Sequence, residues 1–225
     1  MMKIFKNIFL ILFLIGVSLS VKAQNQDHNH DDEKWTEEKT IPFETKYSYP
    51  MADDIKWELV NLKNSKIIAK GNGSIKDFSF KKPGQYELHI FEEIHHVEGG
   101  CNHPNYPSKI MITAGSEKME FDFSTIQFSR KIKAGEDMMG ATLTVNVNVS
   151  SAGKKSTVYN KELKTVGIGT SIKGKLKGGE VKLRNGVNTL VYELEGKATK
   201  DTYIMFIFTD SNALEQSYSL MEKIQ

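Results

Sequence analysis

The sequence predicts an all-β fold in which two antiparallel β-sandwich domains follow a signal peptide and a short disordered leader. Apolar and polar residues alternate from Thr40 onward, in short runs that are bounded by turn residues such as Gly, Asn and Pro. Such alternation is typical of strands with one buried and one solvated face. No segment between these runs has a helical period long enough for the crossover that parallel strands need.

The first residues have the pattern of a secretory signal peptide. Two lysines precede an apolar run over residues 8–17, and the small residues Val21 and Ala23 precede Gln24. The apolar run is shorter than the roughly 20 residues that a membrane-spanning helix requires. We therefore expect residues 1–23 to be cleaved and the mature protein to be exported, to the periplasm or the cell exterior, without a membrane span. An uncleaved membrane anchor is the alternative.

A polar segment follows the expected cleavage point. Residues 24–39 (QNQDHNHDDEKWTEEK) are acidic and almost free of aliphatic side chains. Such a composition favours a disordered leader, because it offers too little apolar surface to offset the entropy of ordering. His28 and His30 lie beside acidic residues and could bind a metal weakly, but a spacer is the interpretation we favour.

The first sandwich is predicted to span residues 40–120. Its turns contain Gly71-Asn72-Gly73, Pro83-Gly84 and Gly115, residue types that favour tight turns. Apolar residues recur mostly at alternate positions in the runs between these turns, so one face of each strand is expected to be buried. The alternating runs lie at residues 41–49, 55–59, 67–69, 75–80, 86–90, 110–112 and 119–123.

The second sandwich is predicted to span residues 121–225. Its clearest strand is 141–149, where Leu143, Val145 and Val147 face one way and the intervening Thr and Asn residues face the other. Gly178-Gly179 and Asn185-Gly186 are turns of the kind that hairpins use. Residues 215–221 are predicted to form a last edge strand, with a short helix as the alternative. The other runs lie at residues 126–132, 158–159, 172–176, 181–183, 190–194 and 203–208.

Two stretches resemble known families. Residues 75–91, with the sequence FSFKKPGQYELHI at their centre, resemble the late strands of PKD-like and other immunoglobulin-like domains. The segment from about Phe121 to Leu220 resembles the secreted immunoglobulin-like proteins that Bacteroidetes conjugative elements encode. The shared features are Ile132-x-x-Gly135, the turn Asn185-Gly186 and a late aromatic strand that ends in Thr209-Asp210-Ser211. These resemblances imply immunoglobulin-like sandwiches and, for the second, an accessory role in conjugative transfer.

Charge and cysteine content restrict the classes of partner. Residues 24–125 contain 12 lysines and 18 acidic residues, whereas residues 126–225 contain 15 basic and 10 acidic residues. Neither half is basic enough to predict nucleic-acid binding, which needs a clustered cationic face. Cys101 is the only cysteine, so no intramolecular disulfide is expected and the hydrophobic cores alone must stabilise the fold.

The irregular stretch 92–107 contains a group of residues that could bind a metal. His95, His96, Cys101 and His103 lie within nine residues of one another, and imidazole and thiolate are the ligands that zinc and copper prefer. Their spacing matches no standard zinc module. We expect a solvated loop without a cofactor, and zinc or copper binding is the alternative.

The sequence contains no recognisable catalytic motif. Gly167-Ile168-Gly169 lacks the third glycine of a dinucleotide fingerprint, and Cys101 and His103 are too close in sequence to form a nucleophile–base pair readily. We therefore expect no enzymatic activity. The predicted function is that of an exported binding or scaffold module that contacts a protein partner at the cell surface or in the periplasm through loops and strand edges. The alternatives are a periplasmic metal-binding protein that uses loop 92–107 and a secreted accessory protein of conjugative transfer.

Overall fold

The computed structural model describes residues 35–93, 105–153 and 156–225, and within these residues the regular structure consists of strands without helices. The prediction of an all-β fold is therefore confirmed. No helix of this described part of the chain is long and apolar enough to cross a membrane. The strands of the first half are β1 (Thr36–Ile41), β2 (Lys46–Tyr49), β3 (Lys56–Asn61), β4 (Lys66–Asn72), β5 (Ile75–Ser79), β6 (Gly84–Phe91) and β7 (Lys109–Ala114).

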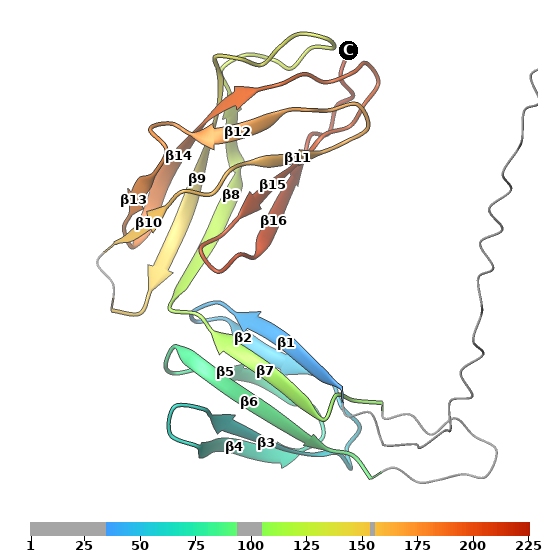
Figure 1. Cartoon of the computed structure of the whole chain (residues 1–225), viewed down its shortest axis with the longest axis vertical. Helices are drawn as coiled ribbons and strands as arrows, with labels where there is room; N and C mark the ends of the chain where they lie inside the picture. Colours follow the sequence, from blue (N-terminus) through green and yellow to red (C-terminus); the bar gives the residue numbers. More distant parts are fainter. Residues whose placement is uncertain (1–34, 94–104, 154–155) are drawn as a thin grey trace, which may run out of the picture. The chain divides into compact units, whose positions relative to one another are not determined.

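These strands form a five-stranded sheet in the order β1-β7-β6-β3-β4 and a separate β2–β5 ladder (Figure 1). Strands β3, β4, β6 and β7 pair antiparallel. The alternation of β6 explains its packing, because Tyr86, Leu88 and Ile90 are buried, whereas Glu87 and His89 point to the opposite face. The buried residues pack with Tyr47 of β2 and Ile75 of β5, so the core lies between the sheet and the ladder.

Strand β1 corrects the prediction of a disordered leader at residues 36–39, the part of the segment 24–39 that lies in this strand. It begins at Thr36 and pairs in parallel with β7, from Thr36 opposite Lys109 to Ile41 opposite Ala114. The backbone, rather than apolar side chains, explains this order, because any sequence can supply ladder hydrogen bonds to an open sheet edge. Residues 24–34, like the predicted signal peptide 1–23, lie outside the described residues.

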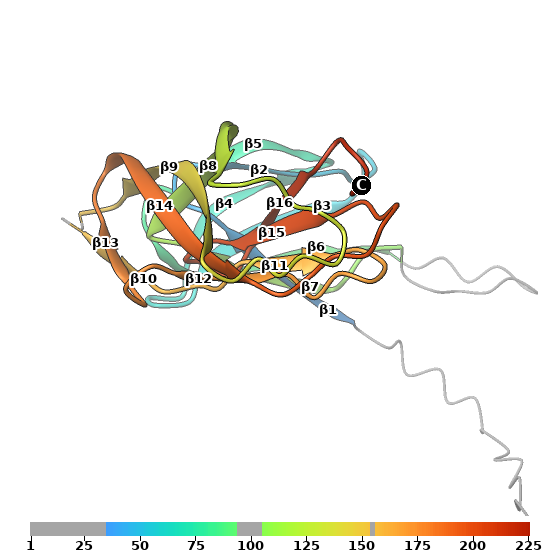
Figure 2. The same ribbon diagram turned by 90° about the horizontal axis from the view of Figure 1, so that it is seen from above.

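The strands of the second half form a further set of sheets. Four strands follow the order β12-β14-β9-β8, three follow β11-β15-β16, and β10 pairs with β13. Figures 1 and 2 both show β15 and β16 as a layer apart from β9 and β14. The strands are β8 (Glu117–Phe128), β9 (Ala141–Ser151), β10 (Thr157–Tyr159), β11 (Lys164–Val166), β12 (Lys173–Leu176), β13 (Val181–Leu183), β14 (Gly186–Glu195), β15 (Met205–Thr209) and β16 (Glu215–Ser219).

Strand β9 has the register that the sequence predicts. Leu143, Val145 and Val147 are fully buried, and Val145 lies opposite Leu190 of β14. Residues 215–219 pair antiparallel with β15, so the predicted last strand is confirmed and the alternative of a terminal helix is wrong. The reason is that β15 is apolar and buried on alternate residues, and its outer edge accepts a further strand.

The buried hydrophobic side chains of the described residues form two clusters. One extends from Tyr47 to Ala114 and the other from Met119 to Ile224. Met119 therefore packs with the second cluster although it precedes residue 121. The domain boundaries 40–120 and 121–225 stay a prediction.

Candidate binding face

The four residues that the sequence singles out as metal ligands, His95, His96, Cys101 and His103, lie outside the described residues. Zinc or copper binding by these side chains therefore stays a prediction. Within residues 35–93, 105–153 and 156–225, no three His, Cys, Asp or Glu side chains come together in a group that could hold a metal ion.

The described residues on both sides of this stretch are tied together. The Glu92 carboxylate accepts hydrogen bonds from the Asn105 N–H (2.9 Å), the Asn105 Nδ2 (2.7 Å) and the Tyr106 N–H (3.2 Å). The Tyr106 hydroxyl in turn accepts a hydrogen bond from the Ala52 N–H at 3.0 Å. Glu92 thus fixes the chain where it leaves β6 and approaches β7, and this structural role occupies both of its carboxylate oxygens.

The outward face of the five-stranded sheet carries side chains that point away from the core of the described residues. The registers of neighbouring strands align Glu38, Met111, Glu87, Val60 and Ile67 in one row across the sheet. These residues alternate with buried ones such as Leu88, so their side chains point away from the core. The row changes from polar at β1 to apolar at β4.

A charged cluster occupies the centre of this face. One Glu87 carboxylate oxygen lies 2.5 Å from the His89 Nε2 and 3.1 Å from the Lys109 Nζ. Glu87 is the most buried of the three, with a side chain that is 16% exposed. Both neighbours therefore direct their hydrogen bonds at the same carboxylate, and the cluster is largely neutralised within the sheet.

The apolar end of the face lies at β4, the last strand of the sheet. Ile67 and Ile68 are 52% and 43% exposed, and Leu62, which follows β3, is 38% exposed. The β3–β4 register shifts between Leu59 and Val60, which is the signature of a β-bulge. We call residues 66–70 the β4 edge.

The bulge overturns one detail of the predicted pattern. The alternation assigned Ile67 and Ala69 to a single buried face, but Ile67 lies opposite Val60 and is half exposed. Ala69 keeps its place opposite Leu59 and packs against the core. The sequence signal was the adjacent pair Ile67-Ile68, because two neighbouring apolar residues interrupt a period of two.

The other half of β4 is anchored to the core. The Trp57 ring lies against Gly71, where an added Cβ would come within 2.8 Å of Trp57 Cζ2. The Trp57 indole N–H also donates to the Gly73 carbonyl at 2.9 Å. Glycine at position 71 is therefore needed for this close approach, and the contact fixes the strand that carries the β4 edge.

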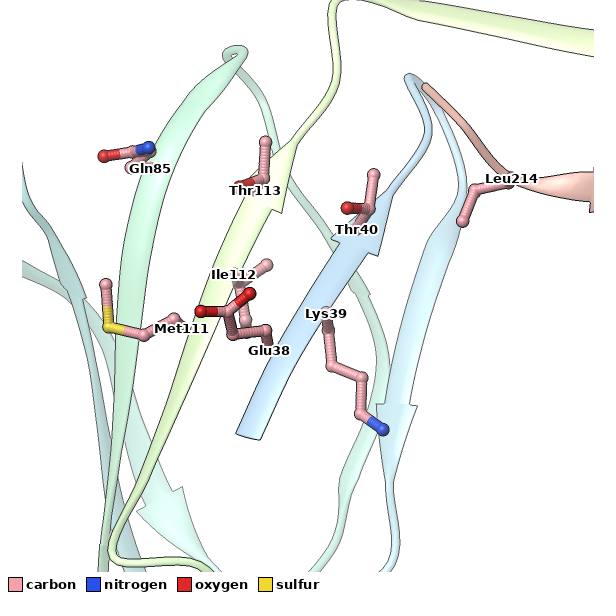
Figure 3. A pocket seen from close by; sticks show the side chains of 8 residues that line it. All are labelled: Glu38, Lys39, Thr40, Gln85, Met111, Ile112, Thr113 and Leu214. Atoms are coloured by element: carbon pink, nitrogen blue, oxygen red, sulfur yellow. The ribbon is translucent and has the colours of Figure 1, made fainter. Parts of the chain in front are cut away.

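A hollow of about 460 Å³ lies at the polar end of the face, near β1 (Figure 3). Glu38 and Thr40 of β1, Met111 and Thr113 of β7 and Gln85 of β6 line it. Figure 3 shows Glu38 and Met111 extending over the same part of the hollow, whereas Lys39 extends on the other side of β1. The lining offers a carboxylate, hydroxyls and an amide, which suit hydrogen bonding more than covalent chemistry.

The comparisons with known proteins identify no family. No family model matches the sequence, and no curated protein matches it. Among solved structures, a β-glucuronidase from glycoside hydrolase family 2 aligns at 10% identity over 80% of this chain, with a TM-score of 0.23. This chain covers only 19% of that enzyme. A DUF3823 family protein from Bacteroides ovatus ATCC 8483 aligns at 15% identity over 84% of this chain and 97% of its own, with a TM-score of 0.24. At such low TM-scores, neither similarity supports a conclusion about function.

Proposed function

We propose that this chain is an exported, non-catalytic binding or scaffold module with immunoglobulin-like sandwiches, which contacts a protein partner through strand edges and loops. The observation that carries the proposal is the outward face of the five-stranded sheet, where Val60, Leu62, Ile67 and Ile68 gather at an edge that no described strand pairs with. Exposed apolar groups beside an unpaired edge are a common feature of surfaces that bind other chains.

The proposed non-catalytic role rests on how the polar groups of this face are used. Glu87 pairs with both His89 and Lys109, and Glu92 accepts hydrogen bonds from backbone and side-chain donors. In each case the hydrogen-bonding capacity serves the fold. A catalytic base instead needs a partner on a substrate.

The proposed location follows from the sequence. The lysine-flanked apolar run and the small residues before Gln24 support export, and the expected partner is a protein of the cell surface or the periplasm. Metal binding by loop 92–107 and an accessory role in conjugative transfer stay predictions.

Site-specific photo-crosslinking in the producing cells tests the proposal. A benzoylphenylalanine at position 62, on the apolar part of the face, is expected to give an adduct of discrete mass with a protein. The matched control is the same residue at position 187, where Val187 is 73% exposed in the second half of the chain. The proposal is wrong if position 62 gives no adduct, or if both positions give the same set of adducts, which would indicate unspecific collision.

A further inference from the structure

The β4 edge differs from the other sheet ends among the described residues. Its Ile67 and Ile68 are adjacent, aliphatic and about half exposed. The terminal strand β12 exposes Lys173 and Lys175 and buries Gly174 and Leu176. The terminal strand β11 exposes a single large aliphatic residue, Val166. Edges are normally protected by charges, by bulges and by a lack of apolar residues. β4 has lysines and a bulge, and only its exposed isoleucine pair departs from this rule.

One side of β4 is available for further pairing. β4 is hydrogen-bonded to β3 on one side, and no strand of the described residues pairs with its other side. In an antiparallel ladder, backbone N–H and C=O groups alternate between the two sides of a strand. An added strand would therefore satisfy the outward groups and cover Ile67 and Ile68 at the same time.

Charge limits which strand can be added. Lys66 and Lys70 lie at the two ends of the β4 edge and are exposed, and Lys63 precedes it. Glu58 of β3 lies opposite Lys70. It is therefore on the side of β4 that already pairs with β3, and not on the side where a further strand would lie. A second copy of β4 running antiparallel would bring the lysines of both chains together at each end, and like charges on neighbouring strands repel. Acidic side chains at these positions would instead attract.

We infer that the β4 edge binds an extended segment of another protein, aliphatic in its centre and acidic at its ends, as an additional strand of the first sheet. This inference rests on the proposed binding function and specifies the class of partner. Lys66 and Lys70 disfavour a second antiparallel copy of the chain, and the isoleucine pair contributes apolar area to the contact.

A peptide series measures this preference by fluorescence anisotropy. The probe is a short synthetic peptide of alternating Val and Thr with Glu at both ends. One comparison peptide carries Lys in place of Glu, and another has alternate backbone nitrogens methylated. We expect the Glu-ended peptide to bind at least about tenfold more tightly than either comparison peptide, because one loses the charge attraction and the other loses the ladder hydrogen bonds.

Charge reversal locates the contact. The double variant Lys66→Glu with Lys70→Glu is expected to invert the preference, so that it binds the Lys-ended peptide more tightly. The matched control is Lys173→Glu with Lys175→Glu, which reverses two exposed lysines on terminal strand β12 and is expected to leave the preference unchanged. All four positions are exposed, and unchanged thermal unfolding in far-ultraviolet circular dichroism, which reports on both halves of the chain, checks that the variants are folded.

An unchanged preference in the β4 variant or an inverted preference in the β12 variant would overturn the inference. A concentration-dependent dimer that Ile68→Glu dissociates would also overturn it, because a second copy would then be the occupant. If position 62 crosslinks to a partner but the peptides are not discriminated, strand addition is wrong and the binding module stands. If the crosslinking also fails, both proposals are wrong.

Discussion

Two tyrosine hydroxyls meet in the core of the second half of the chain. The Tyr159 and Tyr192 oxygens lie 3.0 Å apart, and the Tyr159 O–H donates to the Thr209 carbonyl at 2.9 Å. Burial raises the pKa of Tyr159 to about 12, and the nearby Asp210 also raises it. Burial likewise raises the pKa of Tyr192, and the Tyr159 phenol adds to this effect. Both side chains are therefore held in the neutral, hydrogen-bonded state.

These raised pKa values predict a loss of stability at high pH. An unfolded tyrosine ionises near pH 10, whereas folded Tyr159 ionises near pH 12. The stabilisation is fully present below about pH 10 and is lost as the pH rises toward about 12, because the unfolded state then releases protons that the folded state retains. Urea unfolding across this window should show the decline. The double variant Tyr159→Phe with Tyr192→Phe should show a shallower decline, and an equal slope in both proteins would contradict the assignment.

Val145 and Asn146 are neighbours on β9 whose side chains point to opposite faces, so substitutions at the two positions test the register of this strand. Val145 is fully buried, so Val145→Asp places a carboxylate in the core without a partner and should cost several kcal/mol of a stability of about 5–15 kcal/mol. Asn146 accepts a hydrogen bond from the Thr189 hydroxyl and lies opposite Asp122. Asn146→Asp keeps the acceptor and adds repulsion, at about 1 kcal/mol or less. Thermal unfolding followed by far-ultraviolet circular dichroism measures both variants, and equal midpoints would show that the register is wrong.

Between strands β14 and β12, close packing depends on one glycine. Gly196 has φ +95°, and an added Cβ would lie 2.3 Å from the Ser171 carbonyl oxygen. The approach is close because the Ser171 N–H donates to the Lys197 carbonyl at 2.8 Å and the Lys197 N–H donates to the Ser171 hydroxyl at 3.0 Å. Backbone atoms cannot move aside as a flexible side chain can, so a Cβ here would force the two backbone segments apart.

Gly196→Ala should therefore destabilise the protein more than Gly178→Ala. Gly178 has φ +82° with no atom within 4 Å of a built Cβ, so its substitution costs only the left-handed backbone strain of about 1–2 kcal/mol. Gly196→Ala adds steric overlap, which typically costs a further 1–3 kcal/mol or so. Urea unfolding midpoints compare the two variants directly. Equal midpoints would mean that the distance between Gly196 and the Ser171 carbonyl leaves room for a Cβ.

The strands that the sequence predicts well are those whose order comes from burial. In β9, alternating Val and Leu residues define the buried face, and the register follows from them. Strand β1 is ordered because its backbone pairs with β7. The polar side chains of residues 36–39 give no sign of this pairing in the sequence. The exposure of Ile67 depends on a bulge and on the position of β4 at the sheet end, and both are set by pairing with distant residues.

The candidate binding face could not be predicted from the sequence for the same reason, since it depends on pairing between distant strands. Val60, Ile67, Glu87 and Met111 come from four strands, and only the sheet order aligns them. The sequence predicted only in general terms that strand edges would contact a partner, because β-sandwiches have such edges. It did not identify β4, because the sequence does not distinguish an exposed isoleucine from a buried one until the pairing of the strands is known.

The two hydrophobic clusters predict that the two halves of the chain unfold separately. Both tryptophans report on the first half, because Trp57 packs against its cluster and the Trp35 carbonyl accepts a hydrogen bond from the Ser108 N–H. Val145 belongs to the other cluster. In Val145→Asp we expect the thermal midpoint from tryptophan fluorescence to match the parent, whereas the β-sheet signal in far-ultraviolet circular dichroism falls by roughly half, since substitutions without shared contacts act independently. A joint loss of both signals would show that the clusters fold as one cooperative unit.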